Sequence, residues 1–328
     1  MSQHTSDYDF TLPEHLIARH PCARRDGARM LVVHRDSGTW EHRSVADFAS
    51  YLEPDELVIL NNARVLPARF VSDDGRYDFL LLEGFGSNLW RCLAKPGRKL
   101  RPGVEVMVDG HRAVVDRIDP SDGSRWLAWD APPDLQKIGH MPLPPYMDRE
   151  DTADDRERYQ TVFAEKPGAI AAPTAGLHFT REMLAAIPHA FVTLYVGIGT
   201  FRPVKSELIT DHLMHQERFE IESSTAAAIN AARRICAVGT TCVRVLEGCK
   251  RSEDGLVLPQ QGETAIFLHP PKTIPHVQRL LTNFHLPKST LMMLISAFAG
   301  RELMLEAYAE AIREEYRFFS YGDCMLLV

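Results

Sequence analysis

The chain has 328 residues and a formal net charge of −7, with 45% hydrophobic and 25% charged residues. These values are ordinary for a globular protein of about two domains, so they exclude a disordered or fibrous chain. The negative charge argues against non-specific coating of nucleic acid, which needs a broad positive surface, although it leaves room for a local basic patch.

The six cysteines form no C-x-x-C pair and match no zinc-site spacing. The first residues, MSQHTSDYDF, are polar and acidic, so we expect no signal peptide. The apolar run Leu291–Ala299 has only about half of the ~20 residues that cross a bilayer. We therefore expect a cytoplasmic protein with free thiols and no membrane contact. No long exposed apolar stripe is evident, so we also expect a monomer.

In chain order, Arg29–His34 and Leu57–Leu60 are short apolar runs that predict strands. From about residue 69 to 131, further runs recur every ten to thirteen residues or so, between clusters of Gly, Asp, Asn and Pro, without a helical period. These runs are Asp78–Leu82, Trp90–Ala94, Val104–Val108, Ala113–Ile118 and Arg125–Trp129. They predict a small antiparallel barrel or sandwich, with a functionless β insertion as the alternative.

The segment between Ile138 and Asp155 is rich in proline and acidic residues, and we interpret it as a linker that returns to the first domain. From Tyr159 onward, strand and helix patterns alternate. This pattern predicts a three-layer α/β domain with a mixed sheet, formed by residues 1–68 and 150–328. Residues 69–149 are then the inserted small antiparallel β-barrel and its linker.

Ligands in open α/β sheets bind beyond the carboxyl ends of the strands, and three strand-to-helix junctions here carry polar residues. The first junction contains Thr174, Gly176 and His178. Gly176 would let the backbone approach a ligand, and His178 could act as an acid or a base near neutral pH. The alternative is a loop histidine that is hydrogen-bonded for structure.

At the second junction, Gly239, Thr240 and Thr241 open a helix, where free N–H groups attract a phosphate or a carboxylate. Arg244 and Glu247 are three positions apart and share a face of this helix. A well-capped helix with a surface ion pair is the plainer interpretation.

At the third junction, His285 follows a strand, and Ser289 and Thr290 begin a helix. A second histidine at the start of a helix strengthens the case for a site. Separately, His212, His215 and Glu217 could bind zinc, but a clear fourth ligand is missing.

Several long motifs follow one another along the chain. They are LPEHLIARHP, NNARVLPAR, GHMPLPPY, APTAGLHF, VGTTCVRVLE, TNFHLPKSTLMM and YRFFSYGD. In these motifs the chain resembles the S-adenosylmethionine:tRNA ribosyltransferase-isomerase family of queuosine biosynthesis. The resemblance covers residues 12 to 323, which is nearly the whole chain.

The resemblance implies that the ribosyl part of S-adenosylmethionine is transferred to the aminomethyl group of preQ1, a 7-deazaguanine base at the tRNA wobble position. The sugar is isomerised, which gives epoxyqueuosine-tRNA, adenine and methionine. S-adenosylmethionine is then a consumed co-substrate, and neither a cofactor nor a metal is expected. The family fold is similar to the one predicted above.

The sulfonium acidifies the adjoining ribose methylene, so the family reaction needs a base, and departing adenine needs an acid. We expect His178 and His285 to share these tasks in an order that the sequence leaves open, with Asp323 as a further catalytic group. The methionine carboxylate or a tRNA phosphate would bind Thr240, Thr241 and Arg244. The remaining expected substrate-binding residues are Asn61, Asn62, Arg64, Arg69, Thr174, Gly176, Ser289, Thr290 and Tyr321.

The chain departs from the family pattern by small changes at Cys242 and Ala63, beside motifs that are retained. The segment HPPKT (His269–Thr273) departs more, so the family's loop contacts are not carried over to it. Two other functions stay open. One is a metal-dependent hydrolase that uses His212, His215 and Glu217, and the other is a non-catalytic tRNA-binding relative.

Overall fold

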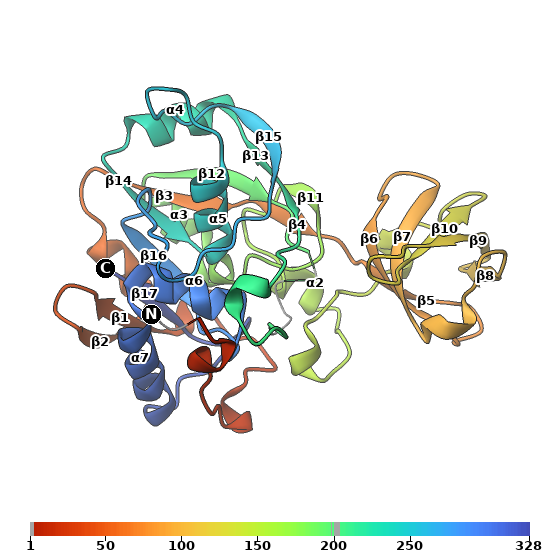
Figure 1. The fold of residues 1–328 in the computed structure, drawn as a ribbon, viewed down its shortest axis with the longest axis horizontal. Helices are drawn as coiled ribbons and strands as arrows, with labels where there is room; N and C mark the ends of the chain where they lie inside the picture. The colour runs from red at the N-terminus through yellow and green to blue at the C-terminus, as the bar shows by residue number, and fades with distance from the viewer. Residues whose placement is uncertain (1–2, 198, 200–203) are drawn as a thin grey trace.

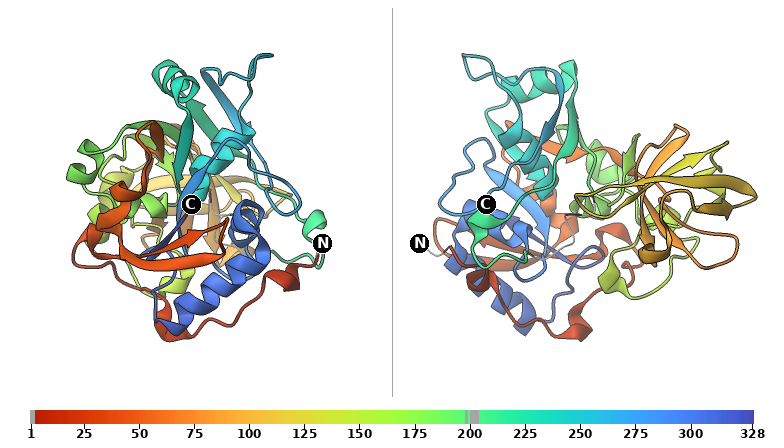
Figure 2. Two further views of the ribbon diagram at one scale, coloured as in Figure 1. Left: turned by 90° about the vertical axis from the view of Figure 1, so that its left-hand side faces the viewer. Right: turned by 45° about the vertical axis from the view of Figure 1, so that its right-hand side comes forward.

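The computed structural model describes residues 3–197, 199 and 204–328. An α/β body contains both ends of the chain, and a curled six-stranded sheet projects from one side of it (Figure 1). The right view of Figure 2 shows the same division from a further direction. No helix in the described ranges is both long and apolar enough to cross a membrane.

A nine-stranded sheet forms the centre of the α/β body. In spatial order, its strands among the described residues are β15 (Gln260–Thr264), β13 (Glu217–Ile221), β12 (His189–Leu194), β3 (Glu56–Asn61), β14 (Arg234–Val238), β16 (Arg279–Asn283), β17 (Cys324–Leu327), β1 (Arg29–His34) and β2 (Thr39–Ser44). The four strands β12, β3, β14 and β16 are parallel, whereas β17 runs antiparallel to β16. The predicted mixed sheet is therefore confirmed.

Both faces of this sheet are buried. Along β1, Met30 and Val32 point into one hydrophobic core, and Leu31 and Val33 point into the other. Continuous apolar runs of this kind are typical of strands that are covered on both sides. The described α-helices are α1 (Leu135–Ile138), α2 (Asp155–Arg158), α3 (Arg181–Ala185), α4 (Ser223–Ala231), α5 (Thr240–Gly248), α6 (Thr290–Ala299) and α7 (Arg301–Arg313).

Helices α4 to α7 contribute their apolar residues to one of the two cores. The other core is closed mainly by α3 and by the 3-10 helices η4 (Val45–Tyr51) and η7 (Thr174–His178). The division into three layers stays a prediction, because short 3-10 segments rather than a layer of long helices cover this second face.

The inserted unit is one antiparallel sheet. Its strands, in spatial order, are β5 (Arg69–Val71), β6 (Asp78–Glu83), β7 (Leu89–Lys95), β10 (Arg125–Trp129), β9 (His111–Ile118) and β8 (Glu105–Val108). The aromatic rings of Phe70, Phe79, Trp90 and Trp129 pack together in its core. The predicted strands are confirmed, but β5 and β8 do not pair along their length, so the sheet is a half-barrel rather than the closed barrel that we expected.

The chain returns to the body through the segment that the sequence predicts to be a linker. Backbone hydrogen bonds between Arg69 and His140 hold its start against β5. A 3-10 helix, η6 (Pro145–Met147), then brings the chain to the α/β body. A short parallel pair of strands, β4 (Ala63–Val65) and β11 (Lys166–Ala169), joins the outgoing and returning segments.

Candidate functional site

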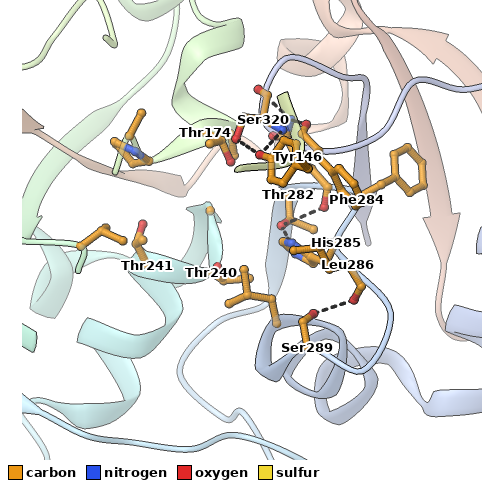
Figure 3. Close-up of a pocket in the computed structure, with 18 residues that line it drawn as sticks. Tyr146, Thr174, Thr240, Thr241, Thr282, Phe284, His285, Leu286, Ser289 and Ser320 are labelled. Atoms are coloured by element: carbon orange, nitrogen blue, oxygen red, sulfur yellow. Dashed lines mark hydrogen bonds between the residues drawn. The ribbon is translucent and has the colours of Figure 1, made fainter. Parts of the chain in front are cut away.

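A cavity of about 600 Å³ lies where the loops after β11, β14 and β16 meet, and we call it the central cavity. Its lining includes five residues that the three junctions predict, and Figure 3 shows them around one space. These residues are Thr174, Thr240, Thr241, His285 and Ser289. The topological rule for α/β sheets therefore brings the three sequence motifs together.

The start of α5 opens onto the central cavity. Gly239 is the N-cap residue and has a φ of 89°, a conformation that favours glycine, and it provides no side-chain cap. The first N–H groups of a helix have no partner inside the helix. The Oγ1 atom of Thr241 is buried and has no hydrogen-bond partner in the described part of the chain. This turn is therefore ready to bind an anionic or polar ligand group.

His285 lies on the wall of the central cavity opposite Thr240 (Figure 3). Its Nε2 atom is 2.9 Å from the Oγ1 atom of Thr282, and its backbone N–H donates to the Oη atom of Tyr308 at 2.8 Å. Burial lowers the pKa of His285 to about 3. The imidazole is therefore neutral at physiological pH, with one ring nitrogen unprotonated.

His178 lies outside the central cavity. It lines a second cavity of about 290 Å³ together with the arginines Arg24, Arg25, Arg158 and Arg317, and we call this space the basic cavity. Burial lowers the pKa of His178 to about 4, against the opposing effects of the Asp323 charge and of Asn283. The expectation that both histidines face one pocket is therefore not met.

Asp323 lines neither cavity. Its carboxylate accepts backbone N–H groups from Arg29 at 2.9 Å and from Arg317 at 2.8 Å. The guanidinium groups of the same two arginines lie 3.5 and 3.8 Å away. These contacts fit an anchor for the C-terminal loop, with an electrostatic influence on His178. Tyr321 lines the basic cavity, where its hydroxyl donates to Asp155 at 2.7 Å.

The four polar residues of the NNARVLPAR motif do not line the central cavity. The amide of Asn61 bonds to backbone groups, including both the N–H and the carbonyl of Leu194 at 3.0 Å. Asn62 accepts from a threonine hydroxyl, and Arg64 is exposed. Arg69 forms ion pairs with Asp78 and Glu150, which raise its pKa. Their expected contacts with a substrate stay predictions.

Gly176 is closely packed. A Cβ atom at this position would lie 2.9 Å from both Phe163 and Thr161, and the residue does not line the central cavity. Close packing of η7 therefore gives a structural reason for this glycine, and its expected contact with a ligand stays a prediction.

The plainer interpretation of α5, a surface ion pair between Arg244 and Glu247, is wrong. Arg244 forms a buried ion pair with Glu217 of β13, whereas Glu247 accepts from His276 at 2.8 and 2.9 Å. Arg244 and Thr290 line a third cavity of about 340 Å³, next to His212 and His215. Within the described ranges no three side chains are grouped to hold a metal, and both oxygens of Glu217 already accept hydrogen bonds.

The sequence did not single out Tyr146, Thr282, Asn283 or Ser320, which all line the central cavity. Tyr146 bonds to the hydroxyl and the backbone N–H of Ser320, and burial raises its pKa. Its motif, GHMPLPPY, was visible but was interpreted as a linker. Thr282 and Asn283 belong to the third junction, where their position at the end of a strand was the available signal.

The site combines a neutral buried imidazole with an open helix start, and both lie at the ends of the parallel strands. This is the arrangement of an enzyme that binds a small substrate. The model of the family described as "Queuosine biosynthesis protein" matches residues 5–327. The chain belongs to this family.

Two similar proteins bear the name S-adenosylmethionine:tRNA ribosyltransferase-isomerase. The one from Desulforamulus reducens is 46% identical and covers 98% of this chain and 99% of its own. The one from Acidithiobacillus ferrooxidans is 48% identical, with 99% and 98% covered. The crystal structure of S-adenosylmethionine tRNA ribosyltransferase from Thermotoga maritima matches with a TM-score of 0.54 and 34% identity, over 98% of this chain and 100% of that chain.

Proposed function

We propose that the chain transfers and isomerises the ribosyl group of S-adenosylmethionine onto the 7-aminomethyl group of preQ1 at the tRNA wobble position. The products are epoxyqueuosine-tRNA, adenine and methionine. The observation that carries the proposal is similarity of 46% and 48% identity, over essentially full length, to enzymes of this name. The central cavity agrees with it, because hydroxyl groups, an imidazole and an open helix start converge there on one space at the ends of the strands.

In this proposal the reacting part of S-adenosylmethionine occupies the central cavity, close to His285 and the start of α5. The sulfonium withdraws electrons from the ribose 5′-methylene, and the neutral imidazole of His285 accepts a proton from that carbon. The electron pair stays on the carbon, where the sulfonium stabilises it. The positive charge moves to the imidazole, which Thr282 holds in place at 2.9 Å.

The departing adenine then takes a proton. Because burial lowers the pKa of both His178 and His285, neither is a protonated acid in the resting enzyme at neutral pH. We propose that His285 returns the proton that it has accepted, so that one histidine serves as base and then as acid. His178, among the arginines of the basic cavity, contributes instead to binding the anionic tRNA.

We also propose that the enzyme acts as a cytoplasmic monomer without a metal or a bound cofactor. Residues 1–68 and 150–328 are the catalytic domain, and residues 69–149 are the inserted domain with its linker. Asn61, Asn62, Arg64 and Arg69 support the fold or the tRNA surface, since none of them lines the central cavity.

The test is to incubate the purified protein with S-adenosylmethionine and preQ1-bearing tRNA and to measure free adenine. We expect adenine to be released, and release to be unchanged by a chelator. Loss of activity with the chelator would favour the metal-dependent hydrolase. Binding of tRNA without any adenine release would favour the non-catalytic relative and contradict the proposal.

A further inference from the structure

We propose that Arg244 binds the α-carboxylate of the methionine part of S-adenosylmethionine in the third cavity, which we call the carboxylate cavity. This inference rests on the proposed function and deepens it. The sequence assigned the anion jointly to Arg244 and the start of α5, and left open whether it is a carboxylate or a tRNA phosphate.

Only one side of the Arg244 guanidinium forms a hydrogen bond among the described residues. The side chain is 6% exposed, and its Nη1 atom pairs with Glu217. The Nε and Nη2 atoms are buried and have no hydrogen-bond partner among the described residues. Nε and Nη2 form the two-donor edge of an arginine, the edge that binds a carboxylate through two parallel hydrogen bonds.

Two buried, charged donors without acceptors are costly, and native proteins rarely leave such groups unpaired. Here the carboxylate cavity adjoins Arg244, so its lining is where an acceptor would be placed. His212, His215 and Thr290 add polar atoms around it. A carboxylate that enters this space would satisfy both free donors at once.

The carboxylate cavity adjoins the central cavity, and Leu291 lines both. Arg244 follows Thr241 by three residues of α5, which is about 4.5 Å along the helix axis. Thr290 likewise follows Ser289, which faces the central cavity. A substrate whose sulfonium lies beside His285 can therefore extend its short amino-acid chain to Arg244. A tRNA phosphate is less suited, because it belongs to a bulky polymer and Arg244 is almost fully enclosed.

Glu217 is a positioning residue in this account. Its Oε1 atom accepts the backbone N–H of Gly197 at 2.8 Å, and its Oε2 atom accepts from Arg244. It therefore fixes the plane of the guanidinium and leaves the two-donor edge free. Arg279 is a suitable control for Arg244, because it also forms a buried ion pair, with Glu56. It differs in that it has a second carboxylate partner, Glu53, at 3.3 Å. It lies at the start of β16, whereas the central cavity lies at the end of that strand.

The experiment compares two competitive inhibitors of adenine release, S-adenosylhomocysteine and its decarboxylated form, which differ only in the carboxylate. For the parental protein we expect the carboxylate to strengthen inhibition by about 10- to 100-fold, the usual effect of charge-assisted hydrogen bonds. In Arg244→Gln this preference should fall to about threefold or less. The decarboxylated inhibitor should bind parent and variant alike, which also reports an intact site.

Arg244→Lys keeps the ion pair with Glu217 but lacks the two-donor edge, so it should lose most of the preference even if Arg244→Gln folds poorly. Arg279→Gln is the control and should keep the parental preference. The inference is overturned if the parental protein shows no preference, or if Arg244→Lys retains it in full. Absence of adenine release from the parental protein would instead contradict the proposed function.

Discussion

The two histidines that looked equivalent in the sequence lie in different chemical settings. His285 faces hydroxyl groups and the start of α5, whereas His178 faces four arginines. The loop of His178 packs Ala175 and Phe179 into one core of the sheet, and Phe284, next to His285, belongs to the core on the other face. A histidine between a strand and a helix therefore predicts a functional junction. The residues that surround the histidine depend on which face of the sheet its loop covers.

The strongest test of this difference is His285→Ala. The variant removes the proposed base, so kcat for adenine release should fall by about 10²- to 10⁴-fold. His34→Gln is a suitable control, because β1 runs antiparallel to β16 through β17, and His34 therefore ends at the opposite edge of the sheet. If His285→Ala releases adenine as fast as this control, the assignment is wrong.

His178→Ala should act mainly on the second substrate. We expect the KM for preQ1-tRNA to rise by about tenfold, as for loss of one or two charged or polar contacts, while kcat changes by less than about threefold. Steady-state kinetics with varied tRNA and saturating S-adenosylmethionine separate the two constants. A loss of kcat as large as that of His285→Ala would remove the contrast between the two cavities.

A smaller effect concerns pH. Both histidines have a folded-state pKa below the usual value near 6.5, so between that value and about 4 the unfolded chain binds more protons. Their contribution to stability is therefore complete above about pH 6.5 and is lost as pH falls, by at most about 1.4 kcal/mol per pH unit for each histidine. Melting temperatures from pH 7 to 4 should fall less steeply for His285→Gln than for the parent, and parallel slopes would contradict the burial of a neutral imidazole.

Local patterns predicted much of the fold. The strand Arg125–Trp129 and the helix that Ser289 and Thr290 begin occur as expected, because strand runs and capping depend on nearby residues. Strand β13 was missed, since its buried Glu217 suggests a metal ligand or a surface residue until its partner Arg244 is known. Whether the inserted sheet closes into a barrel could not be predicted either, because closure depends on the tilt and stagger of all six strands.

The candidate site shows the same limit. Thr240, Thr241 and His285 were predictable, because parallel strands bring their carboxyl ends to one edge. Tyr146 was not predictable, because the sequence of a proline-rich segment does not show which part of the protein that segment packs against. The sequence indicates that Arg244 is functional but does not reveal its partner. That partner, Glu217, lies 27 residues earlier in the chain, on β13 rather than on the same helix.

The central claim is that His285 takes a proton from the ribose 5′-carbon in the central cavity. S-adenosylmethionine with deuterium at that carbon tests it most directly, by measuring deuterium release into water during turnover with preQ1-tRNA. The parental protein should release deuterium together with adenine, and His285→Ala should release almost none. Deuterium release by His285→Ala at the parental rate would contradict the claim.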